Sequence, residues 1–447
     1  MCRSLVNLTE DQSLKSYIPY LLILFFFFLS EASKAEINLR GYASMGVSSL
    51  VDSNGGGDGQ EDPKNVGIVG KRADFYRDLR FGLNITSFLD QDERLLFSSQ
   101  LGAEQVNIFY GSAYRNIPGD PNLRITMAKL KYEAHESLNV DMGLLPANLW
   151  LISQETLISY TYPWMRPPLD VYFSADVISM AGAGISYSRE LGDFTVSAKL
   201  QFGDPVYKDT PWDSQTTVSS AGTYGRFSEI TVEYDNMLGR IAYAESLEST
   251  LYFDNMQPQT STDENGLETV YERESVSEVK FKKVTFFALG FRGDIGDFSI
   301  LSEYTRRASE QGDGMGIRGN AISNAKITME GAYTTIGYNI RDFMPHITFA
   351  GSRQTIKKDR LSLGSTETTL PPELEEIASY QAMVAAAKGT NLGQETVILG
   401  LNYFYTPLFT VKLALEHINA DKDYGGITLS QAGSQGTLVS LGASFIY

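Results

Sequence analysis

The chain has 447 residues, a formal net charge of -17 and 12% aromatic residues, with 25 Tyr and 24 Phe. This negative charge argues against a nucleic-acid partner, because phosphates are bound by clustered Lys and Arg side chains. The single cysteine, Cys2, lies at the amino terminus, so the rest of the chain has no disulfide framework, thiolate metal site or cysteine nucleophile.

An apolar segment near the amino terminus predicts a secretory signal. Residues 17–30 read YIPYLLILFFFFLS and are followed by Ser33-Lys34-Ala35, a small-x-small site that a signal peptidase can cut. A membrane-spanning helix needs roughly twenty apolar residues, so this segment is too short to be one. We therefore expect residues 1–35 to be removed, which makes Glu36 the first mature residue.

The remaining chain alternates apolar and polar residues, which is the period of a β-strand with two different faces. The first such stretch runs from Ile37 to Ser49, with Gly41, Ala43 and Val47 on its apolar side. Similar stretches lie at residues 74–85, 194–202 and 397–405, and the last runs from Thr437 to Tyr447. Strands of this kind also suit a soluble sandwich with one wet face, so alternation alone leaves both folds open.

The lengths of the connections separate these two folds. Short turns are expected near residues 89–92, 134–137, 191–193, 235–237, 293–297, 341–344 and 406–407. Long polar connections alternate with them, at roughly 50–71, 107–122, 146–177, 203–225, 248–280, 307–326, 357–392 and 420–435. Short turns at one rim and long loops at the other are the signature of a membrane barrel.

Aromatic residues beside the short turns support the same fold, because a girdle of aromatic side chains marks a membrane interface. They are Phe88, Phe194, Phe298, Phe343, Tyr405 and Phe409. We predict an all-β fold over residues 36–447, a transmembrane antiparallel β-barrel of about sixteen strands with short periplasmic turns and long extracellular loops. A barrel of this size encloses an aqueous lumen. Its first strand must pair with its last, because lipid cannot satisfy an open edge.

These features together resemble the Gram-negative outer-membrane porins. The resemblance lies in the signal segment, the even barrel and a last strand that ends in an aromatic residue. It implies an outer-membrane location, a homotrimer, contact with outer-membrane lipid, and a terminal strand that the barrel-assembly machinery recognises. The residues that carry this assembly signal are Val439, Leu441, Ala443, Phe445 and Tyr447.

The third long connection, residues 146–177, contains the stretch YTYPWMRPPLDVYF from residue 160. Together with Gly143-Leu144-Leu145-Pro146, it resembles a group of porin-like proteins with a YPWxRPP stretch. In trimeric porins the third loop folds into the barrel and narrows it, and prolines stiffen such a path. The constriction residues that this implies are Glu155, Tyr160, Tyr162, Trp164, Arg166, Asp170 and Tyr172. An outward loop or a contact between subunits is the alternative.

Basic residues on the wall opposite such a loop give porins a transverse field. By alternation, the lumen-facing candidates are Arg40, Arg80, Lys199, Arg292 and Lys412. Each has a simpler interpretation as a solvated wall residue paired with a neighbour such as Asp78, Glu303 or Glu416. A shift of one residue in register would move the whole set to the lipid side.

No catalytic or metal motif accompanies the barrel pattern. The three histidines lie far apart in the sequence, and the acidic stretches lack the full spacing of a calcium loop. We therefore expect no enzyme activity, no metal and no cofactor. The predicted function is passive diffusion of small hydrophilic solutes and ions. The alternatives are a solute-specific channel for a sugar or an anion, and a plugged barrel that serves as a receptor or an anchor.

Overall fold

The computed structural model describes residues 37–54, 75, 78–104, 122–153, 158–172, 177–207, 210–211, 216–255, 258–262, 268–272, 277–311, 314–315, 321–322, 325–358, 391–423, 426 and 433–447. These residues form one large sheet of 17 strands, of which β8 (Thr210–Pro211) has only two residues. No helix among the described residues is long and apolar enough to span a membrane.

The sixteen long strands close into an antiparallel barrel. They are β1 (Ile37–Asn54), β2 (Arg80–Phe88), β3 (Leu95–Glu104), β4 (Asn122–His135), β5 (Leu138–Pro146), β6 (Val177–Leu191), β7 (Phe194–Tyr207), β9 (Thr216–Tyr234), β10 (Met237–Asn255), β13 (Ser277–Ile295), β14 (Phe298–Gln311), β17 (Ala325–Tyr338), β18 (Phe343–Lys358), β19 (Leu392–Thr406), β20 (Phe409–Ala420) and β21 (Gln435–Ile446). The prediction of about sixteen strands is therefore confirmed.

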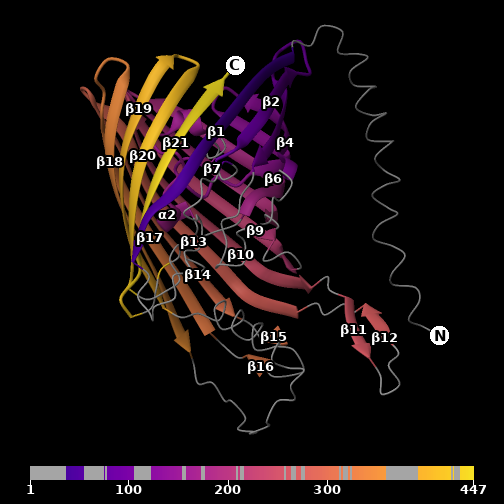
Figure 1. Ribbon diagram of the computed structural model, residues 1–447. Coiled ribbons are helices and arrows are strands. Elements are labelled where there is room, and N and C mark those ends of the chain that lie inside the picture. The colour runs from indigo at the N-terminus through magenta and orange to yellow at the C-terminus, as the bar shows by residue number, and fades with distance from the viewer. Residues whose placement is uncertain are drawn as a thin grey trace, which may run out of the picture.

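Closure is made by the first and last strands, which lie side by side in Figure 1 as the indigo β1 and the yellow β21. Their register pairs Gly46 with Gly442 and Ser48 with Ser440. We call this β1–β21 pairing the seam. Two short hairpins lie outside the barrel sheet, β11 (Pro258–Thr262) with β12 (Glu268–Glu272) and β15 (Gly314–Met315) with β16 (Ala321–Ile322).

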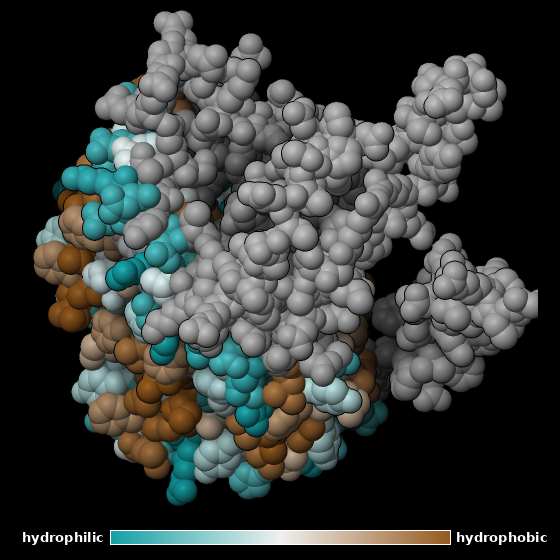
Figure 2. Space-filling model, turned by 90° about the horizontal axis from the view of Figure 1, so that it is seen from below, coloured by the Kyte–Doolittle hydropathy of each residue, from teal (hydrophilic) through white to brown (hydrophobic). Residues whose placement is uncertain are grey.

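The barrel wall has an apolar outer face and a polar inner face. On β10, for example, the outward Ile241 and Leu247 are 50% and 47% exposed, whereas the inward Arg240 is buried. Figure 2, seen from the end that carries the long loops, shows brown apolar residues along the outer side of the wall. An apolar exterior around a polar interior is the inverse of a soluble barrel and is the pattern of a membrane barrel.

Aromatic rings lie beside the short turns and stack across neighbouring strands. Ring centroids are 4.7 Å apart for Phe194 and Tyr234, and 4.8 Å apart for Phe298 and Tyr338. Phe343 and Tyr403 stack in the same way at 4.8 Å. These pairs place the lower edge of the apolar band at the short-turn rim, where an interfacial girdle is expected.

Some of the strand boundaries expected from the sequence are wrong. The alternation at residues 74–85 predicted one strand, but β2 begins only at Arg80, because Asp78 is drawn into the lumen by buried polar contacts. Several strands also run further than expected, since β10 continues to Asn255 and β13 begins at Ser277. Backbone pairing therefore continues into residues that were expected to belong to a long connection.

Candidate functional site

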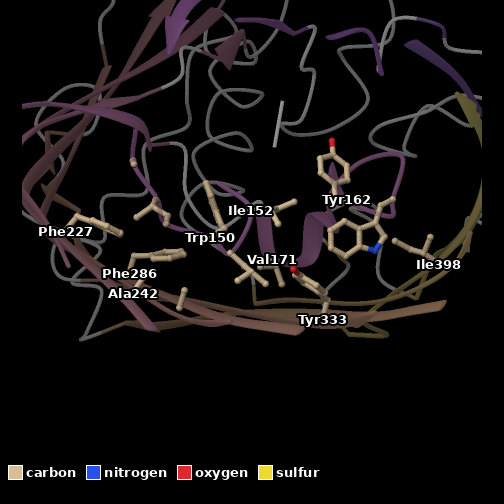
Figure 3. Packing of buried hydrophobic residues seen from close by; sticks show 14 of the residues in the cluster. Trp150, Ile152, Tyr162, Val171, Phe227, Ala242, Phe286, Tyr333 and Ile398 are labelled. Carbon is tan, nitrogen blue, oxygen red and sulfur yellow. The ribbon is translucent and has the colours of Figure 1, made fainter. Parts of the chain in front are cut away.

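A segment between β5 and β6 lies against the inner face of the barrel. We call residues 147–153 and 158–172 the inner segment; it includes a 3-10 turn, η2 (Ser159–Thr161), and one helical turn, α2 (Leu169–Tyr172). Its apolar side chains form a buried cluster with wall residues of β9, β10, β13, β17, β19 and β20. Figure 3 shows Trp150 and Val171 of this segment packed near the wall residues Phe286 and Tyr333.

The first part of the inner segment is held by two charged wall residues. The backbone N–H of Leu151 donates to Oε1 of Glu303 on β14 at 2.7 Å. The guanidinium of Arg240 on β10 donates to the carbonyl oxygens of Leu149, at 3.3 Å, and of Asn148. This part of the inner segment does not pair as a β-strand, so wall side chains provide hydrogen-bond partners for its backbone N–H and C=O groups.

The second part is held by a buried ammonium group. Lys412 on β20 is 2% exposed, and its Nζ donates to the carbonyl oxygens of Ser159, Tyr162 and Trp164. This ammonium also lies 4.8 Å from the centroid of the Tyr162 ring. On the other side, Nη1 of Arg80 donates to the Tyr162 hydroxyl at 2.9 Å. An ammonium carries three donors, and here each is directed at a carbonyl of the same turn.

Trp164 fixes the middle of the YPWMRPP stretch to β17 and β18. Its indole Nε1 lies 3.0 Å from Oγ1 of Thr335 and 2.7 Å from Oγ1 of Thr348. Its ring meets Tyr333 edge to face, with centroids 5.0 Å apart. Trp164 is 1% exposed. Both its apolar surface and its single donor are therefore used in holding the segment to the wall.

The next residue, Met165, docks on the seam. A Cβ placed at Gly442 would lie 2.3 Å from Cε of Met165, and one at Gly46 would lie 2.8 Å from it. Gly46 and Gly442 face each other across β1 and β21. The two missing side chains therefore form a notch that receives the methionine.

Arg166 binds the same seam two residue pairs further along. Its Nη2 donates to Oγ of Ser48 and of Ser440, each at 2.8 Å. Its Nε lies 3.6 Å from Oδ1 of Asp78, whose Oδ2 accepts a hydrogen bond from Ser48. Arg166 and Asp78 are only 8% and 2% exposed. Arg166 was expected to place its charge at a constriction, but its guanidinium is directed at the barrel wall and at the buried Asp78 carboxylate.

The helical turn α2 carries a second buried carboxylate. Oδ1 of Asp170 accepts hydrogen bonds from Ser352 at 3.1 Å and Gln394 at 3.3 Å. Burial raises the pKa of Asp170 to about 6, and the hydroxyl partners only partly offset this. The backbone of α2 lies directly on Gly331, where a Cβ would be 2.1 Å from the Asp170 carbonyl oxygen. Asp170, which was also expected at a constriction, is 3% exposed.

The last described residue of the inner segment is Tyr172. Its hydroxyl donates to Oε2 of Glu303 at 2.9 Å, and its ring stacks on Trp150 with centroids 5.5 Å apart. Burial and the neighbouring Glu303 carboxylate raise the pKa of the Tyr172 hydroxyl. Glu303 therefore joins both ends of the inner segment to the same point on β14.

Of the two remaining residues expected at the constriction, only Tyr160 is described by the structure. Tyr160 reaches the short-turn rim, where its hydroxyl donates to the carbonyl of Pro407 at 2.6 Å and its ring meets Phe404 edge to face. The inner segment thus extends down to the turn between β19 and β20. Glu155 lies outside the described residues.

The five expected wall cations separate into three groups. Arg80 and Lys412 are buried beneath the inner segment and hold it. Arg40 and Arg292 are exposed and lie near the ends of β1 and β13 that adjoin the short turns. Lys199 lies on β7 and is half-buried.

Around Lys199, charged residues of alternating sign cross the wall from β4 to β10. Lys129 on β4 bonds Asp141 on β5 at 2.9 Å, and Arg240 on β10 lies 3.2 Å from Glu229 on β9. Lys199 is paired in register with Glu229. We call these five residues the charged row. Its side chains lie on the inner face of the wall between β4 and β10.

Sequence reasoning missed most of the residues that bind the inner segment. The small polar face of the last strand, with Ser440 and Gly442, was visible as alternation but gave no sign of its partner. Asp78 was named only as a neighbour with which a wall cation could pair, whereas it bonds Ser48 and contacts Arg166. The bonds of Arg166 to Ser48 and Ser440 join residues more than a hundred positions apart, which no local pattern encodes.

Among the described residues, no three His, Cys, Asp or Glu side chains are placed to hold a metal ion. The fold and the inner segment define a membrane-type β-barrel with a structured element inside its lumen. No protein-family model matches the chain, and no curated protein sequence matches it.

Solved structures similar to the chain include outer-membrane proteins. One is an anion-selective porin from Comamonas acidovorans, at 12% identity, covering 93% of this chain and 100% of that one, with a TM-score of 0.49. Another is OmpF of Salmonella typhi in complex with daunomycin, at 12% identity, with 92% and 97% covered and a TM-score of 0.48. A third is the in-vitro folded trimer form of OmpT from Vibrio cholerae, at 10% identity, with 92% and 99% covered and a TM-score of 0.47.

Proposed function

We propose that the protein is an outer-membrane porin, a passive diffusion channel for small hydrophilic solutes and ions. The observation that carries this proposal is the closed barrel of sixteen long strands, apolar outside and polar inside. A barrel of this size is too wide for wall side chains alone to fill, so it encloses water. Solutes then cross by diffusion, with no bond made or broken in the protein.

The inner segment sets the width of the pore in this proposal. It covers the wall from β10 through β21 to β2 and meets the charged row at Arg240, so the open path runs between it and the part of the row from β4 to β9. Because Arg166 and Asp170 are turned to the wall, they act as anchors, and the half-buried Lys129 and Lys199 of the row contribute to the field in the path. Replacing Trp164 and Arg166 by alanine therefore changes single-channel conductance by releasing the segment; unchanged conductance and selectivity in that variant would remove the narrowing role.

Planar-bilayer conductance of the folded protein tests the channel itself. We expect stepwise openings in KCl, with a reversal potential under a salt gradient whose sign reports the preferred ion. Heat-unfolded protein from the same preparation is the control and gives no steps. Silence from protein that is folded and inserted would overturn the proposal and favour the plugged receptor or anchor.

The charged row favours a second candidate, a solute-specific channel. Alternating cations and carboxylates across β4 to β10 offer paired donors and acceptors to a small solute with both kinds of group. Such a channel shows conductance that saturates with one solute class, and Lys199→Gln raises the concentration at half saturation. If conductance rises linearly with concentration for every small solute tested, the solute-specific channel is rejected and the non-selective pore is retained.

Processing and assembly complete the proposal. Residues 1–35 are removed on export, and Val439, Leu441, Ala443, Phe445 and Tyr447 serve as the signal for the barrel-assembly machinery. Three copies associate, as the porin resemblance implies. Removal of the leader is tested by sequencing the amino terminus of protein from outer membranes, and the trimer by cross-linking in the membrane.

A further inference from the structure

A cluster of charges lies on the outer face of the barrel, where the apolar band ends. Both carboxylate oxygens of Glu245 on β10 lie 3.0 Å from Nη2 of Arg226. Its Oε2 also accepts the Tyr243 hydroxyl at 2.7 Å and lies 3.2 Å from Nζ of Lys283. Glu245 shares its face with Ile241 and Leu247, which are 50% and 47% exposed and point away from the lumen. The cluster therefore faces the surroundings of the barrel.

The Glu245 carboxylate is buried by these bonds, whereas Arg226 and Lys283 remain exposed on the outer face. The Glu245 side chain is 3% exposed, against 60% for Arg226 and 43% for Lys283. Arg226 has five N–H donors and Lys283 has three, so several donors are directed outward beyond those that Glu245 uses. Seen from outside, the cluster presents positive charge.

A second cluster lies beside it on β14, β17 and β18. Arg306 lies 3.4 Å from Oε1 of Glu330, which also accepts the Tyr304 hydroxyl at 3.0 Å. Arg353 is exposed and is paired in register with Glu330. The two clusters together hold four cations and two carboxylates, in a chain whose net charge is -17.

Both clusters lie at one height above the short turns. Glu245 and Arg306 are each roughly eight residues into their strands, which corresponds to about 20 Å along the membrane normal for tilted strands. An apolar band in such barrels is about 25 Å tall, so the cations lie where the lipid headgroups of the long-loop side begin.

An apolar groove of about 540 Å³ lies directly below the second cluster, on the outer side of β9 to β17. Its lining includes Ile230, Val232, Gly239, Leu289, Ala332 and Thr334. Tyr304 belongs to both features, because its ring lines the groove and its hydroxyl binds Glu330. Small residues at Gly239 and Ala332 leave the wall hollow between larger neighbours.

We propose that this outer face binds a phosphate-bearing lipid of the leaflet on the long-loop side. Acyl chains lie in the groove, and headgroup phosphates accept hydrogen bonds from Arg226 and Lys283 at the first cluster and from Arg306 at the second. Guanidinium and ammonium groups with spare donors match phosphate oxygens in charge and geometry. A second copy of the chain fits this face less well, because an interface would have to bury four cations, which costs free energy unless each one is paired.

The proposal rests on the membrane barrel proposed above. Native mass spectrometry of the folded protein in neutral detergent tests it with two probes that share their acyl chains, dipalmitoyl phosphatidic acid and dipalmitoyl glycerol. We expect the phosphatidic acid to bind at least tenfold more tightly and to saturate at a small whole number per chain. Equal binding of the two lipids, or uptake that never saturates, would overturn the site.

Two variants separate the headgroup contact from the groove. The double variant Arg226→Gln with Arg306→Gln is expected to weaken phosphatidic acid binding roughly thirtyfold, since each basic residue near a membrane surface contributes about 1 kcal/mol. Gly239→Leu fills the groove and weakens both lipids; a Cβ at Gly239 meets only the Val232 carbonyl at 4.0 Å, so the variant folds without a clash. Arg292→Gln, on the inner face, is the matched control and binds like the parent.

The remaining outcomes each decide something. Loss of an oligomer in Gly239→Leu, with lipid binding retained, would assign the groove to a second copy and overturn the lipid site. Conductance measured on the same samples keeps the two proposals apart. A silent protein that still prefers phosphatidic acid would lose the channel and keep the lipid site, and a conducting protein without that preference would do the reverse.

Discussion

Replacing Lys412 by methionine is expected to release the second part of the inner segment from the wall. The change keeps the length of the side chain but removes the ammonium that bonds the carbonyls of Ser159, Tyr162 and Trp164. Hydrogen bonds to a charged group contribute about 1.5–3 kcal/mol each, and desolvation of the ammonium offsets part of their sum. A net loss of about 3 kcal/mol weakens docking more than a hundredfold.

Thiol labelling can measure this change directly. The chain has one cysteine, Cys2, which lies in the predicted leader, so the mature protein offers no competing thiol. Ser159 is 5% exposed when docked, so Ser159→Cys reacts only when the turn leaves the wall. The labelling rate is expected to rise about a hundredfold when Lys412→Met is added.

The control is Lys422→Met, which removes an exposed cation just beyond the same strand. Heat-dependent migration on a gel verifies that each barrel is folded. Equal labelling rates with and without Lys412, in folded protein, would refute the assignment of the ammonium as the anchor. Larger or noisier single-channel currents in Lys412→Met would link undocking to pore width.

Three further changes test other contacts of the inner segment. Arg166→Ala leaves the Asp78 carboxylate buried without its guanidinium and lowers the thermal unfolding midpoint, at a cost of about 3–5 kcal/mol, whereas adding Asp78→Ala restores part of the loss. Gly442→Leu places a side chain where Met165 docks and raises Ser159→Cys labelling, as Lys412→Met does. Because the pKa of Asp170 is raised to about 6, docking of the inner segment is strongest below about pH 4 and weakens by about 3 kcal/mol as pH rises through 6. The noise of the single-channel current is therefore expected to grow over that pH range. Asp170→Asn is expected to abolish this pH dependence.

Each of these expectations has an opposite that would count against it. Strictly additive losses for Arg166 and Asp78 would mean that the two side chains do not interact. Unchanged labelling in Gly442→Leu, with Gly239→Ala as the control on the outer face, would mean that the notch does not receive Met165. A pH trend that persists in Asp170→Asn would have to come from another titrating group.

The barrel was predictable because its signals are local. Alternation at Val439 to Phe445, and short turns such as Leu191-Gly192-Asp193, follow from the two-residue period of a strand and from turn chemistry. The strand ends were less predictable, since β10 continues to Asn255 after its apolar alternation has stopped. Pairing there depends on neighbouring strands and leaves no periodic signal in the sequence.

The site was only partly predictable, for a different reason. The aromatic and proline content of residues 160–173 marked an unusual segment, but not the direction of its charges. Arg166 reads as a free cation in the sequence, and only the packed barrel brings it to Ser48 and Asp78. The charged row was equally hidden, since Lys129 and Arg240 are ordinary members of alternating strands until closure places them on one wall.

The notch that receives Met165 and the serine pair that binds Arg166 are each built from the two ends of the mature chain. Neither exists until β1 and β21 have met, because each half lies on a different strand. The inner segment is made early in synthesis, and the last residues of the strand that receives it are made at the end. The inner segment can therefore dock fully only after β1 and β21 have paired. A barrel that has not yet closed lacks the docked segment, so the lumen reaches its final width only in a closed barrel.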